Sequence, residues 1–131
     1  MEIYRNIKNP NPDGLHILIE LYGCNSSLLN SQKKIERVFS CSIKEENVIL
    51  LKRSFYKFVP RGLTGFYLLS SSHISIHTWP EFQYCTIDAF TCAGEEATKR
   101  ISNKIINAIK HESCEKKEIK RGFQYKKNNS F

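Results

Sequence analysis

The sequence lacks long apolar runs and contains few of the residues that interrupt helices and strands. Its 131 residues include six glycines, four prolines, one methionine and one tryptophan. No apolar stretch approaches the roughly 20 residues that a membrane-spanning helix needs. The first six residues, Met1 to Asn6, lack the apolar centre of a secretory signal. We therefore expect a cytoplasmic protein with no membrane partner.

The cysteines do not follow a pattern typical of disulfide-rich or zinc-binding domains. There are five of them, an odd number, and no two have the close spacing of a zinc motif. We interpret them as reduced thiols that mostly serve as small buried hydrophobic side chains. This interpretation leaves room for one reactive thiol among Cys24, Cys41, Cys85, Cys92 and Cys114.

The net charge of +7 raises the possibility of a nucleic-acid partner. Its distribution argues against that partner. Residues 110–131 hold seven basic and three acidic side chains, so this terminal segment alone supplies +4 of the total. Such a segment is typical of a solvated strand and tail, and we expect no nucleic-acid binding.

The spacing of apolar residues predicts a single domain, residues 1–131, of the α+β class. Short links between the central strands favour antiparallel pairing, and two amphipathic helices would cover one face of the sheet. We expect a two-layer sandwich with an antiparallel sheet of four or slightly more strands, whose bare face a second copy could cover in an αββα dimer. The predicted strands are 15–22, 48–58, 66–69 running or bending into 76, 84–91 and an edge strand 114–125; the predicted helices are 28–39 and 97–109.

The segment 70–81 is the most informative part of the chain. It alternates with the period of a strand, so that Ile74 and Ile76 share one face. The opposite face carries His73, Ser75 and His77, which are groups that transfer protons or attack carbonyl carbons. A strand that only had to pack would not need them. This pattern indicates a strand that takes part in chemistry.

A tight turn at residues 80–83 would pair this strand with 84–91 as a hairpin. Residues that face each other would then have numbers that sum to about 163 or 164. This places Cys92 opposite Ser71 or Ser72, so a thiol lies beside the serine cluster. His77 would face Thr86 or Ile87, one strand length away from the serine cluster. Taken singly, each residue could be structural. The two histidines are about 13 Å apart on a strand, too far to share a metal ion, and we expect no metal site.

The segment Ser72 to Glu81, followed by Ile87 to Cys92, closely resembles the prokaryotic S-adenosylmethionine decarboxylase proenzymes. Residues 14–24, residues 58–65 and the pair Arg121-Gly122 are similar to further stretches of the same family. The resemblance covers nearly the whole chain.

This resemblance implies a self-cleaving enzyme with a pyruvoyl cofactor. Ser72 would attack the carbonyl of Ser71 and become the pyruvoyl terminus of fragment 72–131, the alpha chain, leaving 1–71 as the beta chain. The pyruvoyl group would then form a Schiff base with the substrate amine. By the same resemblance, His77 assists the cleavage, and Cys92 returns a proton to carbon after CO2 leaves.

The resemblance also implies that Phe58, Trp79 and Glu81 hold S-adenosylmethionine across the interface of a homodimer. The chain departs from the family at two positions. Ser71 stands where the family usually has Glu, which removes a charge beside the scissile bond. Thr64 stands where the family usually has Ser, and it keeps the hydroxyl that supports processing.

The function predicted from this resemblance is decarboxylation of S-adenosylmethionine in polyamine biosynthesis. One alternative keeps the chemistry and changes the substrate to L-ornithine or L-arginine. Another is a non-processing homologue that acts as a regulatory subunit. The loss of the usual Glu at position 71 motivates both alternatives.

Overall fold

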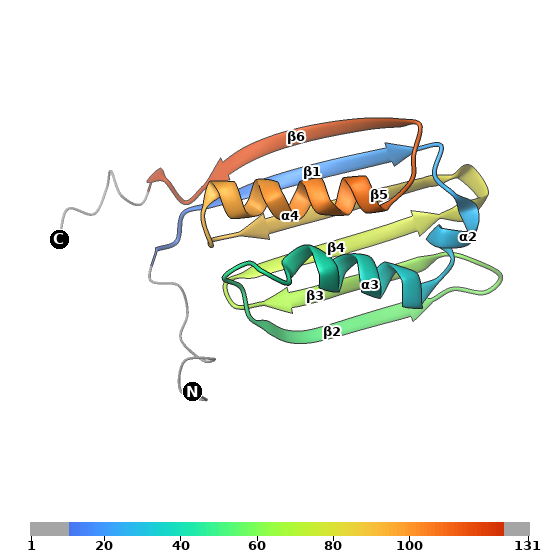
Figure 1. Ribbon diagram of the computed structural model, residues 1–131, viewed down its shortest axis with the longest axis horizontal. Coiled ribbons are helices and arrows are strands. Elements are labelled where there is room, and N and C mark those ends of the chain that lie inside the picture. The colour runs from blue at the N-terminus through green and yellow to red at the C-terminus, as the bar shows by residue number, and fades with distance from the viewer. Residues whose placement is uncertain (1–10, 125–131) are drawn as a thin grey trace.

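The computed structural model describes residues 11–124 and contains a six-stranded antiparallel sheet (Figure 1). The order of strands in the sheet is β2-β3-β4-β5-β1-β6. The α+β class and the antiparallel sheet are thus confirmed, with two strands more than the minimum of four. The strands are β1 (Gly14–Tyr22), β2 (Leu50–Lys57), β3 (Leu63–Leu69), β4 (Ser72–Trp79), β5 (Tyr84–Thr91) and β6 (Ser113–Arg121).

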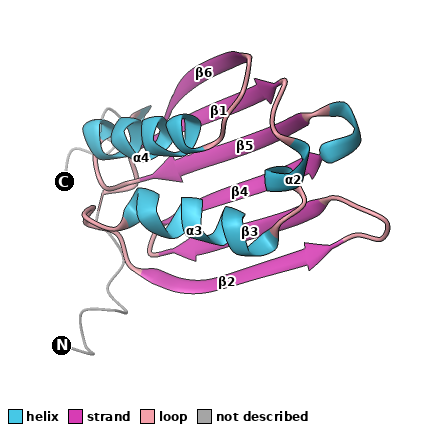
Figure 2. Ribbon diagram, turned by 45° about the vertical axis from the view of Figure 1, so that its right-hand side comes forward, coloured by secondary structure: helices cyan, strands magenta, loops and turns pink. Residues whose placement is uncertain are grey.

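The helices lie on one face of the sheet, as predicted (Figure 2). The two long ones are α3 (Gln32–Ile43) and α4 (Glu95–Ala108), and the short one is α2 (Ser26–Leu29); the 3-10 turn η1 (Pro80–Phe82) forms the link between β4 and β5. The single helix predicted for residues 28–39 is interrupted. Asn25 caps α2 and Ser31 caps α3, each by accepting a hydrogen bond from a backbone N–H three residues on. Two N-caps six residues apart explain the break.

The segment predicted from residue 66 to residue 76 bends rather than running straight. β3 ends at Leu69 and β4 begins at Ser72, and the two strands pair in an antiparallel hairpin. Ser71 in the turn has a φ of 57°, a left-handed conformation that side chains other than glycine seldom adopt. The serine cluster is therefore the turn itself and the first residue of β4.

The core fills the space between the helices and the sheet. Ile74 and Ile76 of β4 are fully buried there, together with Phe39 of α3 and Ile101 of α4. Truncating one such isoleucine to alanine typically costs about 2–5 kcal/mol of stability. The prediction that Ile74 and Ile76 share the packed face of their strand is confirmed.

Among residues 11–124, no helix lies over the other face of the sheet, which carries several large apolar side chains. Phe66 and Leu68 of β3 and Trp79 of β4 are 38%, 42% and 39% exposed. The edge strand predicted for residues 114–125 is β6, which ends at Arg121; position 125 lies outside the described residues. Within residues 11–124, no helix is long and apolar enough to cross a membrane.

Candidate active site

The hairpin of β4 and β5 has the predicted register. His73 faces Phe90 and His77 faces Thr86, so the numbers of facing residues sum to 163. The η1 turn makes this pairing possible because Gln83 adopts a left-handed φ of 52° and donates its backbone N–H to the Pro80 carbonyl. Continued beyond the last pair, this register brings Cys92 to the serine turn.

Ser72 and Cys92 meet at one end of the hairpin, at the left of Figure 1, where β4 begins and β5 ends. The Cys92 backbone N–H donates to Ser72 Oγ at 3.4 Å. Ser72 is only 8% exposed, whereas Cys92 is half-buried. Cys92 lines a cavity of about 380 Å³ together with Asp13, Gly94 and Phe123. A hydroxyl, a thiol and a strained peptide thus lie at one corner of the sheet.

His77, near the other end of β4, and Thr64, which faces it on β3, form a second group. Thr64 Oγ1 and His77 Nδ1 are 2.9 Å apart, which fixes the orientation of the imidazole ring. Trp79 lies two residues further on the same face, its ring centroid 6.3 Å from that of His77. Phe58 follows the end of β2, beside the same end of the sheet, and is 47% exposed.

The aromatic surface around Trp79 continues across β5 and β1. Tyr84 stacks on Trp79 at 5.4 Å between ring centroids, and Tyr22 stacks on Tyr84 at 5.3 Å. Burial, together with a hydrogen bond to the Glu20 carboxylate, raises the pKa of Tyr84 to about 12. The Tyr84 hydroxyl therefore stays protonated at neutral pH, and the three side chains form a row of mutually stacked aromatic rings across β4, β5 and β1.

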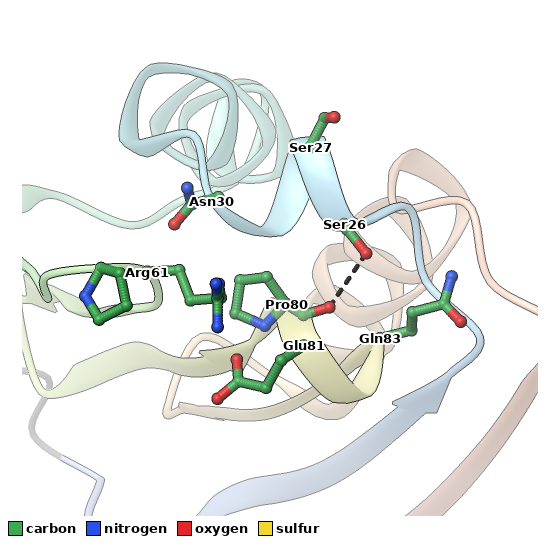
Figure 3. Close-up of a pocket in the computed structure, with 8 residues that line it drawn as sticks. Ser26, Ser27, Asn30, Arg61, Pro80, Glu81 and Gln83 are labelled. Carbon is green, nitrogen blue, oxygen red and sulfur yellow. Dashed lines mark hydrogen bonds between the residues drawn. The ribbon is translucent and has the colours of Figure 1, made fainter.

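Glu81 belongs to a pocket of about 610 Å³ between η1, α2 and the loop that follows β2 (Figure 3). Two polar contacts hold its walls together. Ser26 Oγ donates to the Pro80 carbonyl at 3.0 Å, and the Gly62 backbone N–H donates to Asn30 Oδ1 at 2.9 Å. Arg61 lines the same pocket and is exposed. The pocket is therefore polar and open to solvent.

Ser72 and His77 do not meet within one chain. They are five positions apart on one strand, and a strand rises about 3.3 Å per residue, so their Cα atoms are about 16 Å apart. The predicted residues form two groups: Ser71, Ser72 and Cys92 at one end, and Thr64, His77, Trp79, Glu81 and Phe58 at the other.

A polar cluster between the two ends was missed by the sequence reasoning. His16 Nε2 lies 3.1 Å from Asp88 Oδ1, and Ser75 Oγ donates to Asp88 Oδ2 at 3.5 Å. Arg121 Nη1 lies 3.5 Å from His16 Nδ1. Alternation in residues 15–22 already assigns His16 and Glu20 to one face, but only the pairing of β1 with β5 places that face beside His73 and Asp88. Among the described residues, no three His, Cys, Asp or Glu side chains are grouped to hold a metal ion.

Comparison with known proteins decides the family. The family model for S-adenosylmethionine decarboxylase matches residues 15–122. The chain belongs to the S-adenosylmethionine decarboxylase family. It is 40% identical over 109 residues to the S-adenosylmethionine decarboxylase proenzyme of a Hydrogenobaculum strain, covering 83% of this chain and 81% of that protein. It is 41% identical over 109 residues to the corresponding proenzyme of Methanococcus maripaludis, covering 83% and 89%.

A solved member of the S-adenosylmethionine decarboxylase family has the same fold. The crystal structure of the adenosylmethionine decarboxylase from Aquifex aeolicus matches with a TM-score of 0.79 at 35% identity, covering 84% of this chain and 91% of that one. The resemblance noted in the sequence and the predicted fold class are both confirmed. The matched residues 15–122 include both groups of candidate site residues, from Phe58 to Cys92.

Proposed function

We propose that this chain is the proenzyme of a pyruvoyl-dependent decarboxylase that acts on S-adenosylmethionine, in the cytoplasmic synthesis of polyamines. The observation that carries the proposal is the corner of the β4–β5 hairpin. There Ser72 follows a residue with left-handed backbone, and its hydroxyl oxygen accepts a hydrogen bond from the Cys92 backbone. The relatives' names, which call them decarboxylase proenzymes, support both the activity and the processing.

The proposed processing begins with attack of Ser72 Oγ on the Ser71 carbonyl carbon. The C–N bond of the peptide breaks, the nitrogen takes a proton, and an ester joins the two residues. Removal of the Ser72 α-proton then breaks the Cβ–Oγ bond, which releases residues 1–71 as a carboxylate and leaves dehydroalanine. Hydrolysis by one water gives the pyruvoyl terminus of 72–131 and ammonia. A left-handed φ costs roughly 1–2 kcal/mol for a residue with a Cβ, so the strain at Ser71 favours cleavage there.

The corner suits a ketone cofactor because it combines burial with a proton donor. When formed, a pyruvoyl group supplies an electrophilic carbonyl that condenses with the substrate amine and accepts the electron pair of the breaking carboxylate bond. In this proposal Cys92 holds the proton that replaces CO2, and the contact between its backbone and Ser72 supports this role. A neutral thiol near the reacting carbon is a suitable general acid.

Two copies of the chain are needed to complete the site in this proposal. His77 and the Trp79 surface are about 16 Å or more along the strand from Ser72 of the same chain. A second copy, related by a two-fold axis and packed on the open sheet face, would bring its His77 end to the first copy's Ser72 end. The exposed Phe66, Leu68 and Trp79 support this interface, because they would be buried by it.

The His77 end of the second copy then provides the groups that bind the substrate. Trp79 and Phe58 offer aromatic faces to an adenine ring and to a sulfonium cation. Glu81 offers a carboxylate that can accept hydrogen bonds from ribose hydroxyls. Thr64 orients His77 for proton transfer during cleavage. This combination favours S-adenosylmethionine over ornithine or arginine, which have no ring to stack.

Intact-mass measurement of the purified protein tests the processing. Wild-type protein should give two fragments that separate between Ser71 and Ser72, with a carbonyl at the new terminus that reacts with a hydrazide. Ser72→Ala should remain one chain, whereas Ser70→Ala, which alters a neighbouring hydroxyl, should still cleave. A folded wild-type protein that stays uncleaved would overturn the proposal.

Coexpression of two defective variants tests the composite site. Measured soon after purification, Ser72→Ala alone should be inactive and His77→Ala alone should have little activity, because its cleavage is slowed. In a mixed dimer with shared sites, one site would keep both intact groups, so roughly a quarter of the wild-type sites should be restored. If both groups acted within one chain, the mixture would restore none.

A further inference from the structure

Gly14 and Gly122 lie together at the Ser72 end of the sheet. Gly14 pairs with Arg121 across β1 and β6, so Gly122 lies beside the residues that precede Gly14. Arg121 anchors this corner, because its guanidinium carbon lies 4.9 Å from the centroid of the Phe90 ring. The end of β6 is thereby held against the first residues of β1.

Gly122 packs on the backbone of Pro12 so closely that no side chain would fit between them. A Cβ built on Gly122 would lie 2.5 Å from the Pro12 carbonyl oxygen and 2.8 Å from its carbonyl carbon. The φ of Gly122 is 81°, in the left-handed region that also favours glycine. Two independent features of this position therefore require glycine.

Gly14 likewise packs closely against Cys92. A Cβ built on Gly14 would lie 3.1 Å from Cys92 Sγ and 2.6 Å from the Thr91 carbonyl oxygen. The thiol thus occupies the space beside the bare Cα of Gly14. A side chain at position 14 would collide with the Thr91 backbone and would force Cys92 Sγ to move by a few tenths of an ångström.

The Pro12 carbonyl is the group that this arrangement brings to the thiol. Cys92 Sγ donates to the Pro12 carbonyl oxygen at 3.8 Å. The bond is weak, as thiol donors are, but it is available only to the protonated thiol. A carbonyl oxygen in this place also disfavours the thiolate, because its partial negative charge would repel it, as would the carboxylates of Asp13 and Glu95, which line the same cavity.

We propose that Gly14 and Gly122 are positioning residues for Cys92: their bare Cα atoms let the Pro12 carbonyl reach the thiol and hold it protonated beside Ser72. The inference deepens the proposed function, since it rests on Cys92 as the proton donor. It assigns the two glycines to the decarboxylation step and not to chain cleavage.

Gly122→Ala tests this assignment with little risk to the fold. Pro12 precedes β1, so a methyl at position 122 should displace the segment before Gly14 without breaking the sheet. Cleavage at Ser72 should remain complete and KM unchanged, while kcat falls about tenfold, since small misplacements of a reacting group are costly. Iodoacetamide should alkylate Cys92 about threefold faster at neutral pH, with half-maximal rate reached at lower pH.

Peptide-resolved mass spectrometry separates Cys92 from the other thiols in that assay. Cys41, which is exposed, serves as an internal reference whose alkylation should not change. Gly23→Ala is the matched control, because Gly23 also has a left-handed φ, 68°, but the three atoms nearest to its Cβ would all belong to the Glu112 side chain. It should leave the Cys92 alkylation profile as in the wild type.

Gly122→Asn distinguishes the collision with Pro12 from the backbone conformation. Asparagine tolerates a left-handed φ but still carries a Cβ, so it should reproduce the Cys92 effect. A wild-type alkylation profile in either folded Gly122 variant would overturn the inference. Alkylation can be measured on uncleaved Ser72→Ala protein as well. A failure of the proposed decarboxylation is therefore seen separately, as missing cleavage or CO2 release in the wild type.

Discussion

The two ends of β4 differ in how they are built. At the Ser72 end, Ser72 is buried and its hydroxyl accepts from the Cys92 backbone just after β5, while the Cys92 thiol donates to the Pro12 carbonyl before β1. At the His77 end, His77 and Trp79 stand on the open face and are exposed, held mainly by Thr64 and by neighbouring rings. The first end suits chemistry on the chain itself, which needs a fixed geometry. The second suits binding of a molecule that enters from outside and is covered by a partner.

Replacing His77 should give the largest effect that separates the two ends. His77→Ala removes the proposed base for cleavage while leaving the Ser72 corner intact, so cleavage should slow by about 100-fold or more. The time course of fragment formation, followed by mass spectrometry after rapid purification, measures this rate. His111→Gln is the control, because His111 bonds only a backbone carbonyl near the end of α4. Cleavage at the wild-type rate in His77→Ala would remove His77 from the processing step.

Replacing Cys92 should slow decarboxylation and leave chain cleavage intact, the reverse of the effect of replacing His77. Cys92→Ser should still cleave, because its backbone N–H continues to contact Ser72 Oγ, but CO2 release should fall by about 100-fold since a serine hydroxyl is a far weaker acid. Fragment masses and release of labelled CO2 measure the two steps on one sample. Cys41→Ser should match the wild type in both. A Cys92→Ser protein with full decarboxylation would assign the proton to another group.

Replacing Glu81 should affect substrate binding alone. Glu81→Gln keeps the shape and removes the charge, so KM for S-adenosylmethionine should rise by about tenfold, the scale of a lost charge-assisted hydrogen bond. Cleavage should proceed as in the wild type. Glu45→Gln, an exposed carboxylate near the end of α3, is the matched control. An unchanged KM would mean that the Glu81 carboxylate does not contact substrate.

Local patterns predicted the hairpin well because a short turn fixes its register. The alternation in β4 assigned Ile74 to the core and His77 to the open face, and the turn at residues 80–83 then placed Cys92 beside Ser72. The composite site that we propose also has a local cause. His77 cannot reach its own Ser72, since a strand that separates them by five residues holds them apart.

Contacts between distant segments were not predictable in the same way. His16 and Asp88 are 72 residues apart in the chain, and their contact depends on β1 pairing with β5. The approach of Gly122 to Pro12 depends on β6 pairing with the other edge of β1. No short turn fixes either register. The alternation of residues therefore predicts which face of a strand is buried, but not which strand lies next to it. The break after α2 was missed because the helical spacing of apolar residues continues across it, while two polar caps interrupt the backbone.

The smallest expected effect concerns the cluster between the two ends. Burial lowers the pKa of His73, as do the nearby charges of His16 and Arg121, while Asp88 partly opposes them. The folded state therefore disfavours the charged imidazole, and the unfolded state binds more protons near the ordinary pKa of about 6.5. Stability is complete above that pH and decreases as the pH falls toward 5. His73→Gln should flatten this decrease, so that Tm, measured by circular dichroism, changes by a few degrees less than in the wild type between about pH 7 and pH 5. An equal decrease in both proteins would mean that protonation of His73 does not contribute.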